Sequence, residues 1–224
     1  MRVERNERAP THTTTSHQRK SGMAYGWKHR WSRTPHSSLK TGEPFTRELY
    51  LAAYGRMYRN AGAMTPGTTA ETVDSMSLQK IDAIIDAVRQ ERYRWTPVRR
   101  VSIEKKHSTK KRPLGLSSWS DKLLQEIVRM ILEAYYEPTF SPHSHGFRPE
   151  RGCHTALREI YQTWTGVVWF IEGDIAQCFT SLDHSILLET LSKTIHDGRF
   201  LRLIRELLNA GYAGGVEVPR NIQW

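Results

Sequence analysis

The sequence predicts a helix-rich α/β (α+β) fold, and three kinds of pattern indicate it. Apolar residues recur at helical spacing in several segments, as at Ile81, Ile84, Ile85 and Val88. Residues 98–103 alternate in the manner of a strand, and 167–171 form a short apolar run that ends in charge. Helices of ordinary length mixed with a few strands are typical of this class.

Six helices are expected, separated by loops rich in Gly and Pro. The apolar periodicity places them at about 45–59, 77–93, 120–137, 153–164, 184–195 and 199–210. Ser120 and Asp183 are the expected N-caps of the third and fifth, and Gly211 is the expected C-cap of the last. Pro138 ends the third helix, and residues 60–67 have the composition of a loop.

The expected strands form two separate features. Residues 98–103 and 113–116 flank a basic turn and predict a β-hairpin with a highly positive tip. The run Val167–Asp174 predicts a buried strand, because its side chains are almost continuously apolar.

The positive charge is concentrated in two blocks. The net charge of the chain is +10. Residues 1–40 carry nine Lys/Arg against Glu4 and Glu7, and 89–112 carry ten against Glu91 and Glu104. Clustered positive charge is the footprint of a polyanion partner, although a solvated surface with a basic tail is the alternative.

The remaining composition limits the class of protein. No apolar run approaches the roughly 18 residues of a membrane span, so no membrane association is expected. Cys153 and Cys178 match no metal-binding spacing, which favours a reducing, cytoplasmic location. Residues 1–43 have few aliphatic side chains and are expected to form a disordered basic tail.

Asp174 is the strongest candidate for chemistry. It follows an apolar strand, where a carboxylate could meet a hard divalent cation and a phosphate. The alternative is that the carboxylate only caps the following segment. Glu172 points to the same face of the strand and is read as an ion-pairing residue, and Asp183 as a helix cap.

Two further segments carry charged or metal-binding types of side chain. The hairpin tip could grip a nucleic-acid backbone or a triphosphate, or it could simply be solvated. His143 and His145 have no third ligand at a usual spacing, so no metal site is expected there. Arg148 lies between Phe147 and Pro149 and is expected to be held in place.

Four motifs in order resemble group II intron reverse transcriptases/maturases, over about residues 45–213. Residues 60–67 look like their N-terminal motif, and 111–116 with 121–125 look like their first fingers motif. Residues 144–149, with 151–157, look like the second, and 170–184 look like the first palm motif. The resemblance implies a right-hand polymerase fold, with fingers and the beginning of a palm whose sheet is incomplete.

The family's roles can be carried onto matching residues. The resemblance implies that Asp174 and the Ile175 carbonyl bind Mg²⁺, and that Asp174 is catalytic. It implies that the incoming dNTP is bound by Arg100, Lys106, Arg112 and Phe179, the last of which excludes a 2′ hydroxyl. The residues assigned to RNA are Arg99, Lys105, Lys110, Lys111 and Arg148.

The resemblance also implies partners and a domain layout. The partners are an RNA template, intron RNA, a DNA primer and dNTPs; the oligomeric state is left open. The expected regions are a tail (1–43), an N-terminal extension (44–97), fingers (98–166) and a partial palm (167–224). The implied function is RNA-directed DNA synthesis with help in intron splicing and mobility.

Three departures from the family pattern qualify that function. Thr180 stands where the family has Asp, and Thr69-Ala70 replace an Asp-Gly pair. No Tyr-X-Asp-Asp motif is found, so the chain alone is expected to be inactive. The alternatives are a non-catalytic module that binds intron RNA and a degenerate remnant without function.

Overall fold

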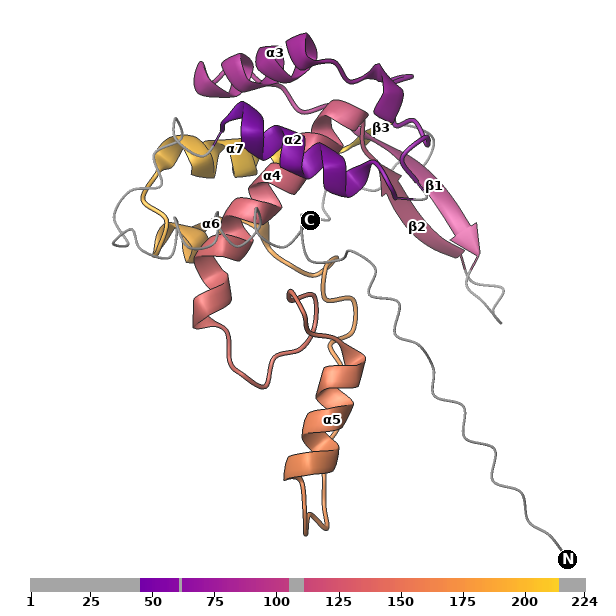
Figure 1. Cartoon of the computed structure of the whole chain (residues 1–224), viewed down its shortest axis with the longest axis vertical. Coiled ribbons are helices and arrows are strands. Elements are labelled where there is room, and N and C mark those ends of the chain that lie inside the picture. The colour runs from indigo at the N-terminus through magenta and orange to yellow at the C-terminus, as the bar shows by residue number, and fades with distance from the viewer. Residues whose placement is uncertain (1–44, 61, 105–110, 214–224) are drawn as a thin grey trace, which may run out of the picture. The chain divides into compact units, whose positions relative to one another are not determined.

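A computed structural model describes residues 45–60, 62–104 and 111–213 (Figure 1). The longer helices are α2 (Arg47–Met57), α3 (Leu78–Arg89), α4 (Trp119–Tyr136), α5 (Cys153–Thr163), α6 (His184–Ser192) and α7 (Gly198–Asn209). Single 3₁₀ turns occupy Val73–Ser75 and Glu137–Thr139. The strands are β1 (Val98–Glu104), β2 (Lys111–Leu116) and β3 (Tyr212–Ala213). The predicted helix-rich α/β class is therefore confirmed.

The core forms where α2, α3 and α4 pack together. The stripe predicted from the sequence, Ile81, Ile84, Ile85 and Val88, is buried along α3. Helix α4 buries Leu123, Leu124, Ile127, Val128 and Ile131, and α2 contacts it (Figure 1). Phe200, Leu203 and Ile204 supply the buried face of α7. Because these faces were continuous apolar stripes, the positions of the helices follow from the sequence.

The sheet has the order β2-β1-β3. Strands β1 and β2 are antiparallel, with Arg99 opposite Leu116 and Glu104 opposite Lys111. The expected tip, with Lys105, Lys106 and Lys110, lies outside the described residues. Strand β3 pairs in parallel with the start of β1 and was not expected, because two residues are too short to leave a periodic pattern.

The predicted N-cap of α4 was wrong by two residues. The cap is Ser118, whose side chain accepts a hydrogen bond from the amide of Asp121. Ser120 instead donates its hydroxyl to the carboxylate of Glu71 at 2.9 Å. A serine side chain can cap a helix at either position. The contact of Ser120 with Glu71, which is distant in sequence, distinguishes Ser120 from the true cap, Ser118.

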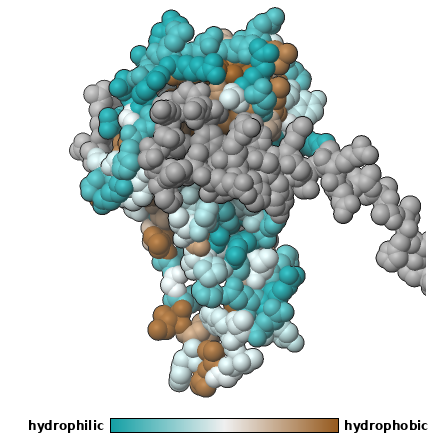
Figure 2. Space-filling view, turned by 60° about the vertical axis from the view of Figure 1, so that its left-hand side comes forward, coloured by the Kyte–Doolittle hydropathy of each residue, from teal (hydrophilic) through white to brown (hydrophobic). Residues whose placement is uncertain are grey.

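The predicted buried strand at 167–174 was also wrong. This segment has no regular secondary structure, and Val168, Phe170 and Ile171 are largely exposed. A strand needs a neighbouring strand for its backbone groups, and this segment pairs with none of the described strands β1, β2 and β3. The space-filling view shows brown, apolar surface open to solvent (Figure 2).

Helix α5 forms where predicted, but its apolar side is not covered. No residue of α5 is buried, and Leu157 and Tyr161 are exposed. Helix α6 likewise begins at its predicted cap, Asp183, and buries none of its residues. Within the described part of the chain, no helix is long and apolar enough to cross a membrane.

Candidate functional site

The two arginines on β1 are held by contacts inside the protein. Arg99 donates from Nη2 to the carbonyl oxygen of Pro66 at 2.8 Å. The guanidinium of Arg100 lies 4.9 Å from the centre of the Tyr212 ring, so β3 supplies its neighbour. Lys111 is exposed, whereas the side chain of Arg112 is not among those that the structure describes. Of the residues predicted to bind a triphosphate on this hairpin, the structure therefore describes only the side chain of Arg100.

The loop that resembles the N-terminal motif is fixed by side chains from α4 and β1. Trp119 donates from Nε1 to the carbonyl of Ala63 at 2.7 Å, and Lys122 donates from Nζ to the carbonyl of Thr65 at 3.0 Å. Burial, and secondarily the charge of Arg99, lowers the pKa of Lys122. Sequence reasoning missed Lys122, because a lysine on a helix ordinarily points to solvent.

Gly67 ends this loop against the start of α4. A Cβ at this position would lie 2.4 Å from the carbonyl carbon and oxygen of Ser117, which is closer than real side chains come. The loop therefore contacts backbone directly, and only glycine fits without a shift.

Asp174 lies on the exposed, irregular segment. Asp174 itself is exposed, and neighbouring Ile175 and Phe179 are 73% and 79% exposed. Arg99 contacts the carbonyl oxygen of Pro66, and Arg100 contacts the ring of Tyr212. The predicted strand-end geometry of Asp174 is wrong in this structure for the same reason as the strand itself.

The donor atoms near Asp174 do not complete a metal site. A carboxylate and a backbone carbonyl are the oxygen ligands that a hard divalent cation prefers, and Mg²⁺ requires about six ligands. Among the described residues, no group of three or more His, Cys, Asp and Glu side chains could hold a metal ion. The oxygen donors of Asp174 and of the Ile175 backbone suit Mg²⁺, which usually keeps several waters and takes only one or two carboxylates from a protein.

Asp183, in contrast, has the role that the sequence predicted. It accepts hydrogen bonds from the amides of Ser185 at 2.7 Å and Ile186 at 3.1 Å. These bonds, that from Ile186 first, lower the pKa of its carboxyl group.

Arg148 is fixed, as expected, but its guanidinium faces the protein. It donates to the carbonyls of Ser141 at 2.7 Å and Ser144 at 2.9 Å, and it forms an ion pair with Glu137 at 3.0 Å. It also lies 5.3 Å from the centre of the Phe140 ring. These contacts hold the loop in place.

The two histidines of that loop share one carboxylate, that of Glu159. His145 contacts Glu159 through Nε2 at 2.9 Å, and His143 contacts the other oxygen of the same carboxylate. These contacts, that with His143 first, lower the pKa of Glu159. His145 also contacts the hydroxyl of Thr155 at 2.8 Å, so both histidines tie the loop to α5.

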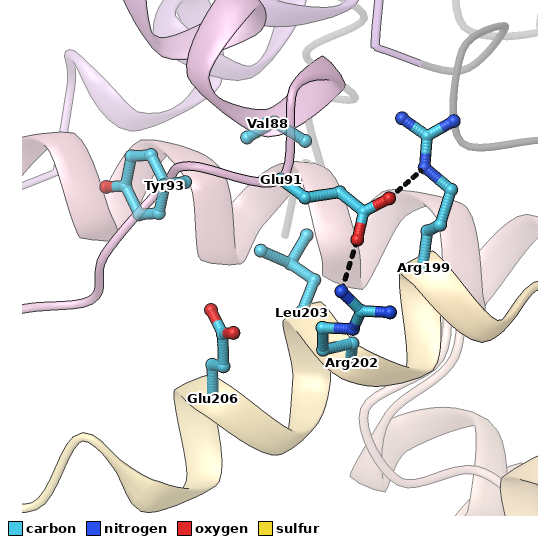
Figure 3. A pocket seen from close by; sticks show the side chains of 7 residues that line it. All are labelled: Val88, Glu91, Tyr93, Arg199, Arg202, Leu203 and Glu206. Carbon is cyan, nitrogen blue, oxygen red and sulfur yellow. Dashed lines mark ion pairs between the residues drawn. The ribbon is translucent and has the colours of Figure 1, made fainter.

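A small pocket lies where the end of α3 meets α7 (Figure 3). Glu91 lies between two arginines of α7 and forms ion pairs with Arg199 at 2.8 Å and Arg202 at 2.5 Å (Figure 3). Glu91 adopts a positive φ of 56°. The sequence did not single out these residues. Because Glu91 forms ion pairs with both arginines, we interpret the pocket as a structural contact between the end of α3 and α7.

The family is shown by a direct comparison. The model for "Reverse transcriptase (RNA-dependent DNA polymerase)" matches residues 103–222, which is more than half of the chain and includes Asp174. The chain therefore belongs to the reverse transcriptase family.

Its relatives include proteins named for introns. A protein called "Uncharacterized 91 kDa protein in cob intron" from Schizosaccharomyces pombe is 50% identical over 74% of this chain. The "Group II intron-encoded protein LtrA" of Lactococcus lactis subsp. cremoris is 47% identical over 74%, and "Nuclear intron maturase 1, mitochondrial" of Arabidopsis thaliana is 37% identical over 40%. The predicted resemblance to group II intron proteins is confirmed.

The chain is short beside these relatives. The matched region makes up 20% of the Schizosaccharomyces pombe protein, 28% of the Lactococcus lactis protein and 13% of the Arabidopsis thaliana protein. An activity that requires the full length of these relatives is therefore a proposal for this chain.

Proposed function

We propose that this chain forms the fingers and the beginning of the palm of an RNA-directed DNA polymerase that also assists the splicing and mobility of a group II intron. The match to the reverse transcriptase model over residues 103–222 carries the proposal. Support for the intron role comes from relatives whose names refer to group II introns and intron maturases. The substrates are an RNA template, a DNA primer and dNTPs, and intron RNA is the further partner.

The proposed roles follow the motifs of the family. Asp174 and the carbonyl of Ile175 provide part of the ligand set of a divalent metal ion, for which we propose Mg²⁺. Such an ion stabilises charge that develops on the reacting phosphate. The ring of Phe179 lies against the sugar of the nucleotide and excludes a 2′ hydroxyl.

The proposed phosphate contacts come from the basic hairpin. Arg100, Lys106 and Arg112 bind the triphosphate, and guanidinium groups can do so with two parallel hydrogen bonds. The contacts with RNA come from Arg99, Lys105, Lys110, Lys111 and Arg148. Arg148 acts through the loop that it holds, because its guanidinium bonds to backbone carbonyls.

A non-catalytic RNA-binding module is the second candidate. The exposed, irregular segment around Asp174 favours it, since no group of three or more His, Cys, Asp and Glu side chains among the described residues could hold a metal ion. In that function the basic residues bind intron RNA while Asp174 has no catalytic role. The expected cytoplasmic location and the four-region layout remain predictions.

Metal-directed cleavage of the chain tests the role of Asp174. Fe²⁺ in place of Mg²⁺, with added ascorbate and hydrogen peroxide, generates hydroxyl radicals that cut the backbone next to the bound ion. We expect cuts around residues 172–176 that disappear in Asp174→Asn and persist in the neighbouring Glu172→Gln. Cuts that do not depend on Asp174 would favour the RNA-binding module, provided that the chain binds RNA.

RNA affinity measured over a series of salt concentrations tests the binding role that both candidates share. Neutralising Lys105, Lys110 and Lys111 to Gln should reduce the salt slope by about 2, at roughly 0.7 per phosphate contact on a single strand. As a control, Arg47→Gln with Lys193→Gln removes exposed charges that already pair with acids, and should leave the slope unchanged. Equal slopes for all three proteins would contradict the hairpin's role.

A further inference from the structure

Phe147 is the most exposed aromatic side chain in the described part of the chain. Its exposed fraction is 102%, so the ring projects wholly into solvent. Its φ is +55°, in the left-handed region that bulky side chains rarely adopt. Neither the full exposure nor the backbone strain benefits folding.

The loop that carries Phe147 is built to hold this conformation. The guanidinium of the next residue, Arg148, binds the carbonyls of Ser141 and Ser144 and the carboxylate of Glu137. Its side chain is only 8% exposed. On the other side, His145 contacts Thr155 and Glu159 on α5. Phe147 therefore stands on a loop that is braced on both sides.

Strain that the surroundings enforce is a sign of function rather than of packing. A non-glycine residue in the left-handed region is strained and persists where neighbouring contacts determine it. Since the ring gains no burial in return, the strain has no structural compensation. What the loop achieves is the rigid presentation of one aromatic face.

The surroundings favour a flat ligand with polar edges. Apart from Phe147, residues 143–151 are polar, charged, Gly or Pro, so no neighbouring residue of this loop extends the ring into an apolar patch of the kind that docks proteins. Glu150 is exposed nearby and disfavours a phosphate directly beside it. A nucleobase is flat, has polar edges and can stack on the ring without placing its phosphate beside Glu150. The net charge of +10 attracts the strand that carries the base.

We propose that Phe147 is a stacking platform for one unpaired base of a single-stranded nucleic acid. The inference rests on the proposed function, because it assumes that the chain binds nucleic acid. Aromatic side chains stack on bases with little sequence preference, since every base has a π face. Arg148 is the positioning residue that holds the platform.

The test compares Phe147→Leu and Phe147→Trp in the full chain. Leu occupies the same strained position without a π face, whereas Trp keeps one. The probes are a short labelled RNA, DNA of the same sequence, and the same backbone with all bases replaced by abasic spacers. We expect Phe147→Leu to weaken binding about tenfold and Phe147→Trp to preserve it. The difference should vanish on the abasic strand.

Two controls separate stacking from a structural role. Tyr161→Leu removes an aromatic side chain of similar exposure on α5 and should leave affinity unchanged. Phe147→Gly relieves the positive φ, so its melting temperature should not fall although its affinity does. A weaker RNA affinity, a weaker DNA affinity, or both, identifies the strand that contacts the ring.

The outcomes distinguish this inference from the proposed function. If the unmodified chain binds neither RNA nor DNA, the binding role itself fails, and the platform with it. If it binds but Phe147→Leu binds equally well, or loses the same factor on the abasic strand, only the platform is overturned. A lower melting temperature or altered self-association with unchanged affinity would assign the ring to a protein contact and also overturn it.

Discussion

One buried side chain in the first turn of α4, Asp121, collects several hydrogen bonds that stabilise the fold. Asp121 is 1% exposed, and its carboxylate accepts from the hydroxyls of Tyr93 at 2.7 Å and Ser118 at 2.8 Å and from the amide of Thr96 at 3.1 Å. A buried carboxylate is stable only with such a set of donors. This one joins the segment after α3 to the first turn of α4.

We predict that Asp121→Asn lowers the free energy of unfolding by about 2–3 kcal/mol, because an amide group cannot accept from all of these donors. Tyr93→Phe, which removes one donor, should cost about 1 kcal/mol. Urea denaturation measures both values. Equal losses for the two variants would contradict the central role of Asp121.

Gly67 determines how closely the loop approaches α4. We predict that Gly67→Ala destabilises the protein by about 1–3 kcal/mol, because the added methyl group overlaps the backbone of Ser117 and Ser118. Gly55→Ala is the matched control, since a Cβ there meets no atom within 4 Å and the residue lies inside α2. Alanine should stabilise that helix by roughly 0.5–1 kcal/mol. Urea denaturation should therefore give shifts of opposite sign.

At the scale of elements, helices whose apolar stripes meet a partner are anchored, and the others depend on their ends. Helices α3 and α4 have buried faces, whereas α5 and α6 have none. A short helix without a buried face is marginal in water, so its capping interactions carry more weight. For α6 that interaction is the carboxylate of Asp183.

We predict that the start of α6 frays in acid. Because the pKa of Asp183 is depressed in the folded protein, its stabilising contribution is present above the ordinary value of about 3.9 and is lost as pH falls through the lower, folded value. The amides of Ser185 and Ile186 should shift together in an NMR titration across this range. In Asp183→Ala both amides should already have frayed positions at neutral pH and lose this titration. Amide shifts that follow a midpoint above the ordinary value would contradict the prediction.

The whole molecule has a packed body and an apolar run that this body does not cover. Residues 167–171 are mostly exposed, and the exposed fraction of Ile171 is 100%. Exposed apolar segments with high strand propensity tend to pair with another copy or another chain. The structure therefore gives a physical reason to expect self-association, although the sequence left the oligomeric state open.

We predict that the chain self-associates as its concentration rises, and that Trp169→Lys with Ile171→Lys shifts this association to at least about tenfold higher concentration. Sedimentation velocity measures the shift. Leu157→Lys with Tyr161→Lys, on the exposed side of α5, is the matched control with the same added charge. An equal effect of both pairs would show that net charge, and not the 167–171 segment, governs association.

The sequence by itself determined the family and most helices, because ordered motifs and apolar stripes are local properties of the chain. The stripe of α3 and the Asp183 cap of α6 are of this kind. Only the tertiary structure decided which serine caps α4, that Lys122 and Arg99 hold the 63–67 loop, and that 167–174 has no strand partner. These outcomes depend on contacts between residues far apart in sequence, such as that between Glu71 and Ser120, or on the presence of a neighbouring strand. Local sequence patterns contain no information about either.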